Sequence, residues 1–284
     1  MPGDPSSSAP APLDLAMGVE ADPDTPGSFV GAGRDYGPLR IYGGHLVGQA
    51  LAAGLATVEA DKLAHSLHAY FLRTGNPAQP IRYRVEPLRS GGRYATRAVH
   101  ASQDGEPLLS MMISFKSAEP GEAHQPDMPQ VPDPSAAARR RREVGGEPLA
   151  LPFAAPFGIE LEAVDDWHPR AEGGQDPEIT LWMRAPMSAQ ADARARQCAL
   201  AYLSDGSLMF NALRPYGSVV STHRATSLDH SLWFHRDADP GDWLLFDQHS
   251  PAAGDSRGLN LGSIFDDAGR LVASVAQESM LRRI

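Results

Sequence analysis

The stretch Gln197–Leu213, QCALAYLSDGSLMFNAL, constrains the fold of this chain more than any other. Its apolar residues fall on all sides of a helix rather than along one stripe, which is typical of a helix inside a protein core or a membrane. It is shorter than the roughly 20 residues that a membrane-spanning helix needs, and Asp205 lies near its middle. We therefore predict a buried helix that carries a carboxylate. A buried carboxylate is costly unless it is paired, hydrogen-bonded or functional.

Composition narrows the possible classes of protein. The 284 residues suffice for one large domain or two ordinary ones, and the net charge of −10 argues against a general nucleic-acid binder. Cys198 is the only cysteine, so an intrachain disulfide is excluded and a reducing, cytoplasmic location is favoured. Its place in an apolar helix indicates a small core residue rather than a nucleophile. No leader peptide and no apolar run of spanning length is recognised, so neither secretion nor membrane insertion is expected.

The first half predicts one buried helix followed by strands. Residues 1–28 are expected to form a flexible segment in which Leu13–Met17 makes one short helical turn. A second helix of small and apolar residues follows at Gly43–Val58, after a short strand and turn at Phe29–Tyr42. Four strands in sequential, antiparallel order come next, with Asp104-Gly105 as a hairpin turn between the last two. These strands are expected at Ser66–Leu72, Ile81–Leu88, Tyr94–Ser102 and Leu108–Phe115.

A Pro- and Arg-rich linker over residues 119–150 separates this half from the next. Its run Arg139–Arg142 is most simply a solvated segment, and contact with a ligand phosphate or a partner is the less favoured alternative. The second half repeats the plan around the helix that carries Asp205. Its strands are expected at Phe157–Val164, Glu178–Arg184, Ser227–His235, Asp242–His249, Gly258–Phe265 and Leu271–Met280.

An internal repeat supports this division. Residues 69–73, AYFLR, match residues 232–236, LWFHR, at an offset of 163, and Gly105 with LLS matches Gly269 with VAS at an offset of 164. We therefore predict an α+β fold made of a duplicated helix-plus-sheet unit. The first unit spans residues 29–118 and the second, residues 151–284.

The repeat also locates a candidate site. At these offsets Ser227 corresponds to Ala64 and Gln277 to Ile113, and alignment of the two helices places Asp205 near Leu51. Polar residues in one copy alone indicate a single site, hosted by the second unit. A buried carboxylate can act as a general base toward water, and a hydroxyl and an amide can hold that water or a carbonyl oxygen in line. No G-x-S-x-G elbow surrounds any serine, so attack by water is favoured over a covalent intermediate.

Structural interpretations stand beside these functional ones. Ser227 and Gln277 could each simply satisfy buried backbone groups, and Asp229 could cap or turn a strand. Four histidines suggest a metal site, but strand alternation places neighbours on opposite faces and no H-x-x-x-H motif or cysteine pair appears, so no metal or cofactor is expected. They are His65, His68, His230 and His235. Gly43-Gly44 lacks the Lys-Ser/Thr of a phosphate-binding loop and indicates close backbone approach, with free N–H groups where a thioester oxygen or an anion could lie.

Five motifs in the right order resemble the acyl-CoA thioesterase II family. They are IYGGHLVGQAL (Ile41–Leu51), HSLHAYFLRTGNPAQPI (His65–Ile81), ALAYLSD (Ala199–Asp205), SLDHSLWFHR (Ser227–Arg236) and VASVAQESMLR (Val272–Arg282). The resemblance implies a double hot-dog fold, in which each of two tandem units wraps a long helix in an antiparallel sheet. It also implies hydrolysis of acyl-CoA thioesters to fatty acid and CoA, without metal or covalent intermediate.

The family's water-activating set is an Asp, a Thr or Ser, and a Gln. These roles carry over onto Asp205 through ALAYLSD, onto Ser227 through SLDH and onto Gln277 through VAQE. Serine stands here where some members have threonine, and the missing methyl could loosen the hydroxyl rotamer. His45 stands where glutamine is frequent, and the long Pro- and Ala-rich N-terminal segment also departs from the pattern.

Two other functions remain open at this point. A hydratase or dehydratase on the same fold needs an Asp and a His working together, and no histidine follows Asp205 at a suitable spacing in the sequence. A non-catalytic acyl-CoA-binding or scaffold protein would have no need of a buried base. Acyl-CoA is the expected partner in either case, with no nucleic acid or membrane. Because sheets of this kind pair edge to edge, a homo-oligomer is also expected.

Overall fold

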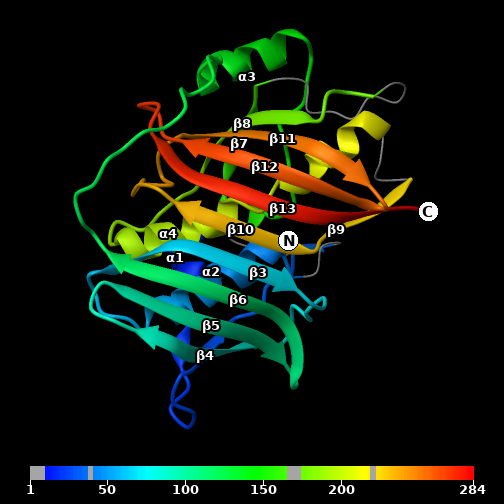
Figure 1. The fold of residues 1–284 in the computed structure, drawn as a ribbon. Coiled ribbons are helices and arrows are strands. Elements are labelled where there is room, and N and C mark those ends of the chain that lie inside the picture. Colours follow the sequence, from blue (N-terminus) through cyan, green and yellow to red (C-terminus); the bar gives the residue numbers. More distant parts are fainter. Residues whose placement is uncertain (1–9, 38–40, 165–173, 218–221) are drawn as a thin grey trace, which may run out of the picture.

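One antiparallel sheet runs through the whole molecule. The structure is a computed structural model that describes residues 10–37, 41–164, 174–217 and 222–284. In it, all the strands of the described residues join in the order β1-β2-β4-β5-β6-β3-β10-β13-β12-β11-β8-β7, and β9 pairs with β13 outside this order. Figure 1 shows β3 and β10 side by side at the middle of the sheet, with the helices α2 and α4 behind it.

The first half of the chain contains two helices and six strands. The helices are α1 (Leu13–Ala16) and α2 (Gly43–Leu55). The strands are β1 (Glu20–Ala21), β2 (Ser28–Gly31), β3 (Lys62–Phe71), β4 (Ile81–Ser90), β5 (Tyr94–Gln103) and β6 (Glu106–Ser117). The predicted hairpin between β5 and β6 is confirmed, because Asp104 and Gly105 both have the positive φ angles that a tight two-residue turn requires.

The second half adds the remaining elements. Its helices are α3 (Pro134–Glu143), α4 (Ala193–Leu203) and the 3-10 helices η2 (Ala155–Phe157) and η3 (Leu208–Tyr216). Its strands are β7 (Glu160–Ala163), β8 (Glu178–Arg184), β9 (His223–Ser227), β10 (Asp229–Phe234), β11 (Leu244–Gly254), β12 (Arg257–Phe265) and β13 (Leu271–Arg283). No helix among the described residues combines the length and the apolar character needed to cross a membrane.

The strand order repeats about the centre of the sheet. Read outward from the centre, one side is β3-β6-β5-β4-β2-β1 and the other is β10-β13-β12-β11-β8-β7. The two sides meet where β3 pairs antiparallel with β10, and there His68 faces Ser231. These two residues are separated by 163 positions, the offset found in the sequence repeat. The duplication is thus visible as an approximate two-fold relation between the halves.

The two long helices pack closely against each other in opposite directions. Gly44, at the start of α2, lies beside the backbone of Tyr202 near the end of α4, and a Cβ atom at Gly44 would lie 2.4 Å from the Tyr202 carbonyl oxygen. At the other end of α2, the carbonyl oxygen of Leu55 accepts a hydrogen bond from Arg194. The start of α2 therefore meets the end of α4, and glycine is what permits this distance.

Three predictions about individual elements were wrong. The stretch Gln197–Leu213 is not one helix, because α4 ends at Leu203 and η3 begins at Leu208. The intervening Ser-Asp-Gly-Ser run consists of residues that compete with helical hydrogen bonding: Ser204 bonds back to the Ala201 carbonyl oxygen at 3.0 Å. Asp205 therefore lies in a turn between two helices, not in the middle of one.

Strand order and strand continuity also differ from the expectation. β3 pairs with β6 rather than with β4, because the Pro-containing connection after Phe71 crosses to the other side of the unit instead of forming a hairpin. The predicted strand Ser227–His235 is divided at Leu228 into β9 and β10, which pair with different parts of β13.

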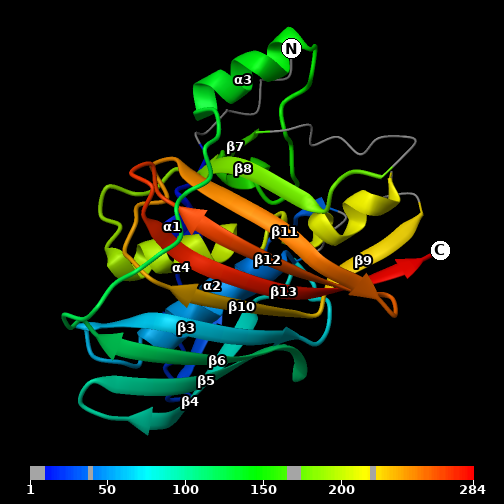
Figure 2. The ribbon, with the colours of Figure 1, turned by 45° about the horizontal axis from the view of Figure 1, so that its top comes forward.

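The segment treated as a linker contains helix α3, which Asp133 caps by accepting the Ala136 N–H. Figure 2 shows α3 at the end of the sheet formed by β7 and β8, and Arg141 of α3 forms an ion pair with Glu162 on β7. The predicted turn at Leu13–Met17 is confirmed as α1, and both of these residues are buried. The flexible segment was predicted over residues 1–28. Residues 1–9 lie outside the described residues, and residues 10–28 contain α1 and β1.

Candidate active site

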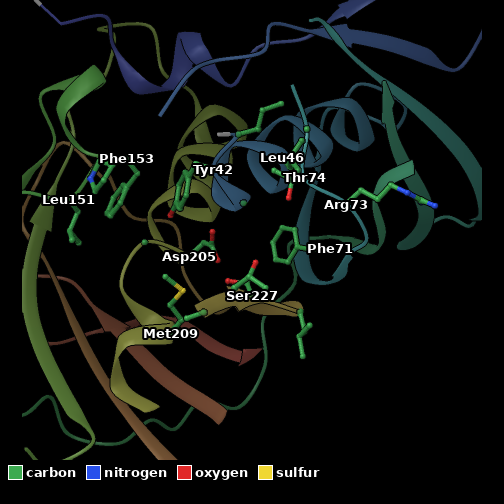
Figure 3. Close-up of a pocket in the computed structure, with 18 of the residues that line it drawn as sticks. Tyr42, Leu46, Phe71, Arg73, Thr74, Leu151, Phe153, Asp205, Met209 and Ser227 are labelled. Carbon is green, nitrogen blue, oxygen red and sulfur yellow. The ribbon is translucent and has the colours of Figure 1, made fainter. Parts of the chain in front are cut away.

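Asp205 lies in the wall of a cavity between the two halves of the molecule. The cavity has a volume of about 310 Å³, and Figure 3 shows Asp205 and Ser227 pointing into it, with Tyr42, Phe71 and Met209 around them. The side chain of Asp205 is only 4% exposed. The first half of the chain contributes the start of α2 and the end of β3 to this cavity, and the second half contributes Asp205 and Ser227.

The start of α2 lies directly against the Asp205 carboxylate. A Cβ atom at Gly43 would lie 2.7 Å from Asp205 Oδ2, so glycine is required for this approach, as the sequence indicated. Burial raises the pKa of Asp205 to about 6, while hydrogen bonds from Gln277 and from the Gly44 backbone act in the opposite direction. Asp205 is therefore a carboxylate whose proton affinity suits exchange with a substrate near neutral pH.

Gln277 contacts Asp205 directly from the adjacent strand β13. Its Nε2 donates a hydrogen bond to Asp205 Oδ1, and the side chain is completely buried. Its Oε1 is also buried and has no hydrogen-bond partner among the described residues. Gln277 is not one of the residues that line the cavity. It therefore stands behind Asp205 as seen from the cavity.

Ser227 reaches the cavity because β9 and β10 break at the next residue. There Leu228 N–H donates to the Glu278 carbonyl oxygen, and Asp229 Oδ1 accepts the Glu278 N–H at 2.7 Å. This bond supports the interpretation of Asp229 as a turn residue. Ser227 is the last residue of β9, pairs with Ser279 on β13 and is half-buried. Ser227 therefore lies opposite Ser279, two residues from Gln277 on β13.

His230 completes the surroundings of Asp205, and sequence reasoning missed it. Its Nδ1 lies 3.2 Å from Gln277 Nε2 and 3.9 Å from Asp205 Oδ1, and its Nε2 lies 2.9 Å from the Ser204 hydroxyl. Burial lowers the pKa of His230 to about 3, so the ring is neutral at physiological pH. The search for a histidine near Asp205 in the sequence failed because the contact comes from a strand far along the chain. The repeat carried a signal, since His230 corresponds to Leu67 at an offset of 163.

The other candidates have structural surroundings. The remaining three histidines considered for a metal site each contact a serine hydroxyl, at His65–Ser114, His68–Ser231 and His235–Ser274. His65 and His68 lie on β3, and His235 directly follows β10. Cys198 is buried, which raises the pKa of its thiol to about 12 and leaves no thiolate near neutral pH. Within the arginine run, Arg141 forms an ion pair with Glu162 on β7.

Apolar side chains dominate the rest of the cavity wall. They come from the start of α2, the end of β3, the segment before η2, and η3. The principal ones are Ile41, Leu46, Phe71, Leu72, Leu151, Phe153, Met209 and Phe210. The polar side chains of Arg73, Thr74, Thr226 and Ser227 also line it. A mainly apolar cavity that contains a buried carboxylate is suited to a substrate with an apolar chain and one reactive polar centre.

Comparisons with known proteins place this architecture in a family. Two family models match consecutive parts of the chain: the acyl-CoA thioesterase N-terminal domain over residues 34–116 and the acyl-CoA thioesterase C-terminal domain over residues 124–281. Acyl-coenzyme A thioesterase 8 of Homo sapiens is 35% identical over 86% of this chain and 81% of its own length. Acyl-CoA thioesterase 2 of Haemophilus influenzae is 34% identical over 89% of this chain and 92% of its own length.

Solved structures agree with these matches. An acyl-CoA thioesterase II from Mycobacterium marinum superimposes with a TM-score of 0.79 and 33% identity, covering 96% of this chain and 97% of the other. A protein described as having a hot dog fold, from Alicyclobacillus acidocaldarius, superimposes with a TM-score of 0.76 at 19% identity, which supports the fold alone. The chain therefore has the double hot-dog fold and belongs to the acyl-CoA thioesterase II family.

Proposed function

We propose that the protein hydrolyses acyl-CoA thioesters to free fatty acid and CoA, with Asp205 as the general base for an attacking water. The observation that carries the proposal is the position of Asp205, buried in the wall of an apolar cavity with its pKa raised to about 6. A base of this kind is mostly ionised at neutral pH and still has enough proton affinity to activate water. Membership of the acyl-CoA thioesterase II family supplies the substrate class.

The proposed reaction needs no covalent intermediate. Asp205 takes a proton from water as the water oxygen attacks the thioester carbonyl carbon, and a tetrahedral oxyanion forms. The carbon–sulfur bond then breaks, and the proton held by Asp205 passes to the departing sulfur, which gives CoA as the free thiol. Ser227, which lines the cavity, orients the water and the thioester, and Gln277 holds the Asp205 carboxylate in position through its hydrogen bond. The positive end of the α2 dipole, at Gly43, is placed to favour the negative charge that develops on the carbonyl oxygen.

The geometry also bears on the hydratase alternative. Asp205 and His230 do come together, with 3.9 Å between Oδ1 and Nδ1, which is the pairing that such chemistry needs. His230, however, is completely buried and is not one of the residues that line the cavity. A substrate in the cavity would contact Asp205 without contacting His230, so hydrolysis remains the better-supported function.

Free-thiol release from a panel of acyl-CoAs, short to long, tests the proposal. Wild type should turn over part of the panel, and Asp205→Asn should lose about 10²- to 10⁴-fold in kcat, the usual contribution of a general base. Asp247→Asn is the matched control: Asp247 is a half-buried carboxylate on β11 that accepts from Thr180, and asparagine keeps an acceptor there. Equal rates in wild type and Asp205→Asn would remove Asp205 from the mechanism. Saturable binding without turnover by wild type would favour the binding-protein alternative.

The proposal extends to assembly as a homo-oligomer. Two copies of the chain could form few hydrogen bonds through the edges of the sheet, because the outermost strands β1 and β7 have only two and four residues. The outer face at the centre of the sheet instead exposes Tyr70 (63%) and Met112 (51%), beside His68 and Trp233, whose rings lie 5.2 Å apart. An apolar patch on the approximate two-fold relation suits a second copy of the chain. Light scattering after size exclusion should show an oligomer for wild type and a smaller species for Met112→Glu. A monomeric wild type would contradict this.

Domain division and location complete the proposal. We propose that residues 29–118 and 151–284 act as two hot-dog units joined by residues 119–150, with the catalytic set in the second. The repeated strand order supports this, and limited proteolysis should cut first within the joining segment. A cytoplasmic location, with a role in lipid metabolism, is supported by the single free cysteine, Cys198. Cell fractionation that recovers the protein from another compartment would contradict it.

A further inference from the structure

A continuous chain of hydrogen bonds lies behind Asp205. The Ser204 hydroxyl donates to the Ala201 carbonyl oxygen at 3.0 Å and lies 2.9 Å from His230 Nε2. His230 Nδ1 lies 3.2 Å from Gln277 Nε2, which in turn donates to Asp205 Oδ1. Ser204, His230 and Gln277 are all completely buried. Water therefore does not compete for these bonds.

The positions of the hydrogens follow from this geometry. A hydroxyl has one hydrogen, and Ser204 uses it for the Ala201 carbonyl, so toward His230 it can only accept. His230 must then carry its hydrogen on Nε2, and its Nδ1 is left with a lone pair. The two hydrogens on Gln277 Nε2 are thereby assigned: one goes to Asp205 Oδ1 and the other to His230 Nδ1.

The alternative orientation of the Gln277 amide is unfavourable in this setting. With nitrogen and oxygen exchanged, the amide oxygen would face both the Asp205 carboxylate and the His230 lone pair, and two acceptors in contact repel each other. In the favoured orientation Gln277 Oε1 is buried and has no hydrogen-bond partner among the described residues. The favoured orientation is therefore fixed by the two hydrogen bonds that Gln277 Nε2 donates, one of them to the catalytic carboxylate.

We propose that Ser204 and His230 are positioning residues for this reaction. Through a neutral His230 protonated on Nε2, they hold the Gln277 amide so that its nitrogen, and not its oxygen, faces Asp205 and keeps the carboxylate in place for proton transfer. The inference rests on the proposed function of Asp205. Neither Ser204 nor His230 lines the cavity, so both act through Gln277 rather than on the substrate.

The first half of the molecule argues against a purely structural role. His230 corresponds to Leu67 and Gln277 to Ile113, and these two residues face each other across β3 and β6 as a fully buried apolar pair. The same place in the fold is therefore filled by apolar side chains where no carboxylate adjoins it. The first unit therefore folds without these polar side chains.

The tautomer of His230 is the first test, and it needs no turnover. The protein is labelled with ¹⁵N-histidine, and long-range ¹H–¹⁵N correlation spectra of wild type and His230→Asn are compared to assign the His230 signals. The expected result is a neutral ring with its hydrogen on Nε2 from pH 5 to pH 8, and loss of this single tautomer in Ser204→Ala. A ring protonated on Nδ1, or on both nitrogens, would overturn the proposal.

Two substitutions at His230 separate its two bonds. The amide oxygen of His230→Asn can occupy the place of Nδ1 and keep an acceptor for Gln277. The amide nitrogen of His230→Gln can occupy the place of Nε2 and keep a donor for Ser204, but offers Gln277 no acceptor. We expect kcat to be nearly retained in His230→Asn, with KM little changed. In His230→Gln and Ser204→Ala, kcat should fall about 10- to 100-fold, because Gln277 can then rotate and lose its hydrogen bond to the charged Asp205.

Kinetics and stability together decide between positioning and structure. Chemical unfolding of each variant gives the loss of stability, and activities are compared per folded molecule. A merely structural role predicts that kcat does not differ between His230→Asn and His230→Gln once folding is taken into account, and that result would overturn the proposal. If His230→Gln does not fold, the kcat of Ser204→Ala and the tautomer of His230 test the positioning role instead. Failure of the proposed hydrolysis would appear separately, as wild-type turnover that Asp205→Asn leaves intact.

Discussion

The two halves of the molecule place different chemistry at the same position of the same fold. On β3 and β6, Leu67 faces Ile113, and on β10 and β13, His230 contacts Gln277; all four side chains are completely buried. The first pair belongs to the main hydrophobic core, whereas the second pair supports a carboxylate. A duplicated unit can thus keep one copy as an apolar scaffold and use the other for a polar site, at a cost in hydrophobic burial.

The first half nevertheless contributes to the site. The start of α2 approaches Asp205 so closely that no side chain fits at Gly43, and Tyr42 lines the cavity. The hydroxyl of Tyr42 donates to the Tyr202 carbonyl oxygen at 2.8 Å, which ties the start of α2 to the end of α4. The two halves therefore have different roles. The second half supplies the Asp205 carboxylate with Gln277 and His230, and the first half supplies part of the cavity wall and the start of α2.

Replacing a polar residue of the second half by its counterpart from the first should have the largest effect. Gln277→Ile leaves Asp205 Oδ1 and His230 Nδ1 without their donor, and we expect kcat to fall about 10²- to 10³-fold, comparable to the loss of one preorganised donor in other active sites. Thiol release measures this. Ile113→Val is the matched control on β6, with kcat expected to stay within about twofold. A Gln277→Ile enzyme that keeps more than a tenth of the wild-type kcat would contradict the role of Gln277.

In the first half, a substitution is expected to lower stability and to leave kcat unchanged. Leu67→Ala opens a cavity in the core, so the free energy of unfolding should fall by about 2–5 kcal/mol. Because Leu67 is not one of the residues that line the cavity, kcat per folded molecule should be unchanged. Urea unfolding and thiol release on the same preparation check both. A loss of kcat larger than the loss of folded protein would mean that the two halves do not divide their roles in this way.

Asp205→Asn should stabilise the protein near neutral pH. The folded pKa of about 6 lies above the ordinary value of 3.8, so between about pH 4 and pH 6 the folded state binds more protons than the unfolded state. Stability therefore falls as the pH rises through this window, by up to roughly 3 kcal/mol. Asparagine carries no such charge. Urea unfolding should show the variant more stable than wild type at pH 7.5, with the difference shrinking by pH 4; a variant less stable at pH 7.5 would contradict the burial of an unpaired charge.

The smallest effect is expected at Ser227. Ser227→Thr keeps the hydroxyl and adds a methyl group that restricts its rotamers, so kcat should change by no more than about threefold. Ser227→Ala removes the hydroxyl and should lower kcat by about 10-fold or more if that group orients the water. Measurement of both variants separates the hydroxyl from the methyl group. Equal kcat for Ser227→Ala and wild type would remove Ser227 from the catalytic set.

Much of the fold could be predicted from the sequence because its signals are local. The Asp104-Gly105 turn, the helix from Gly43 and the strand at Glu178–Arg184 all follow from nearby residues, and the structure confirms them. The order of β3 could not be predicted, because pairing with β6 depends on which path the chain takes around α2 and not on the residues of β3 itself.

The site shows the same limit. The sequence indicated Asp205, Ser227 and Gln277, and the structure places Gln277 in contact with Asp205 and Ser227 in the same cavity wall. The exit of Asp205 from the helix was missed, although Ser-Asp-Gly-Ser at residues 204–207 is a turn signal, because the hydrophobic residues continue beyond the turn into η3. His230 was missed because contact across β10 and β13 depends on strand register, which a search for nearby residues does not include.

The pH dependence of kcat/KM tests the general-base assignment most directly. Asp205 is the group expected to titrate in the relevant window, because burial raises the pKa of Tyr42 and of Tyr202 well above the ordinary range and lowers that of His230 to about 3. Since the base must be ionised, kcat/KM should rise with pH along one limb with an apparent pKa of about 6 and then level off. The residual activity of Asp205→Asn should lack this limb. A flat profile for wild type, or the same limb in Asp205→Asn, would contradict the assignment.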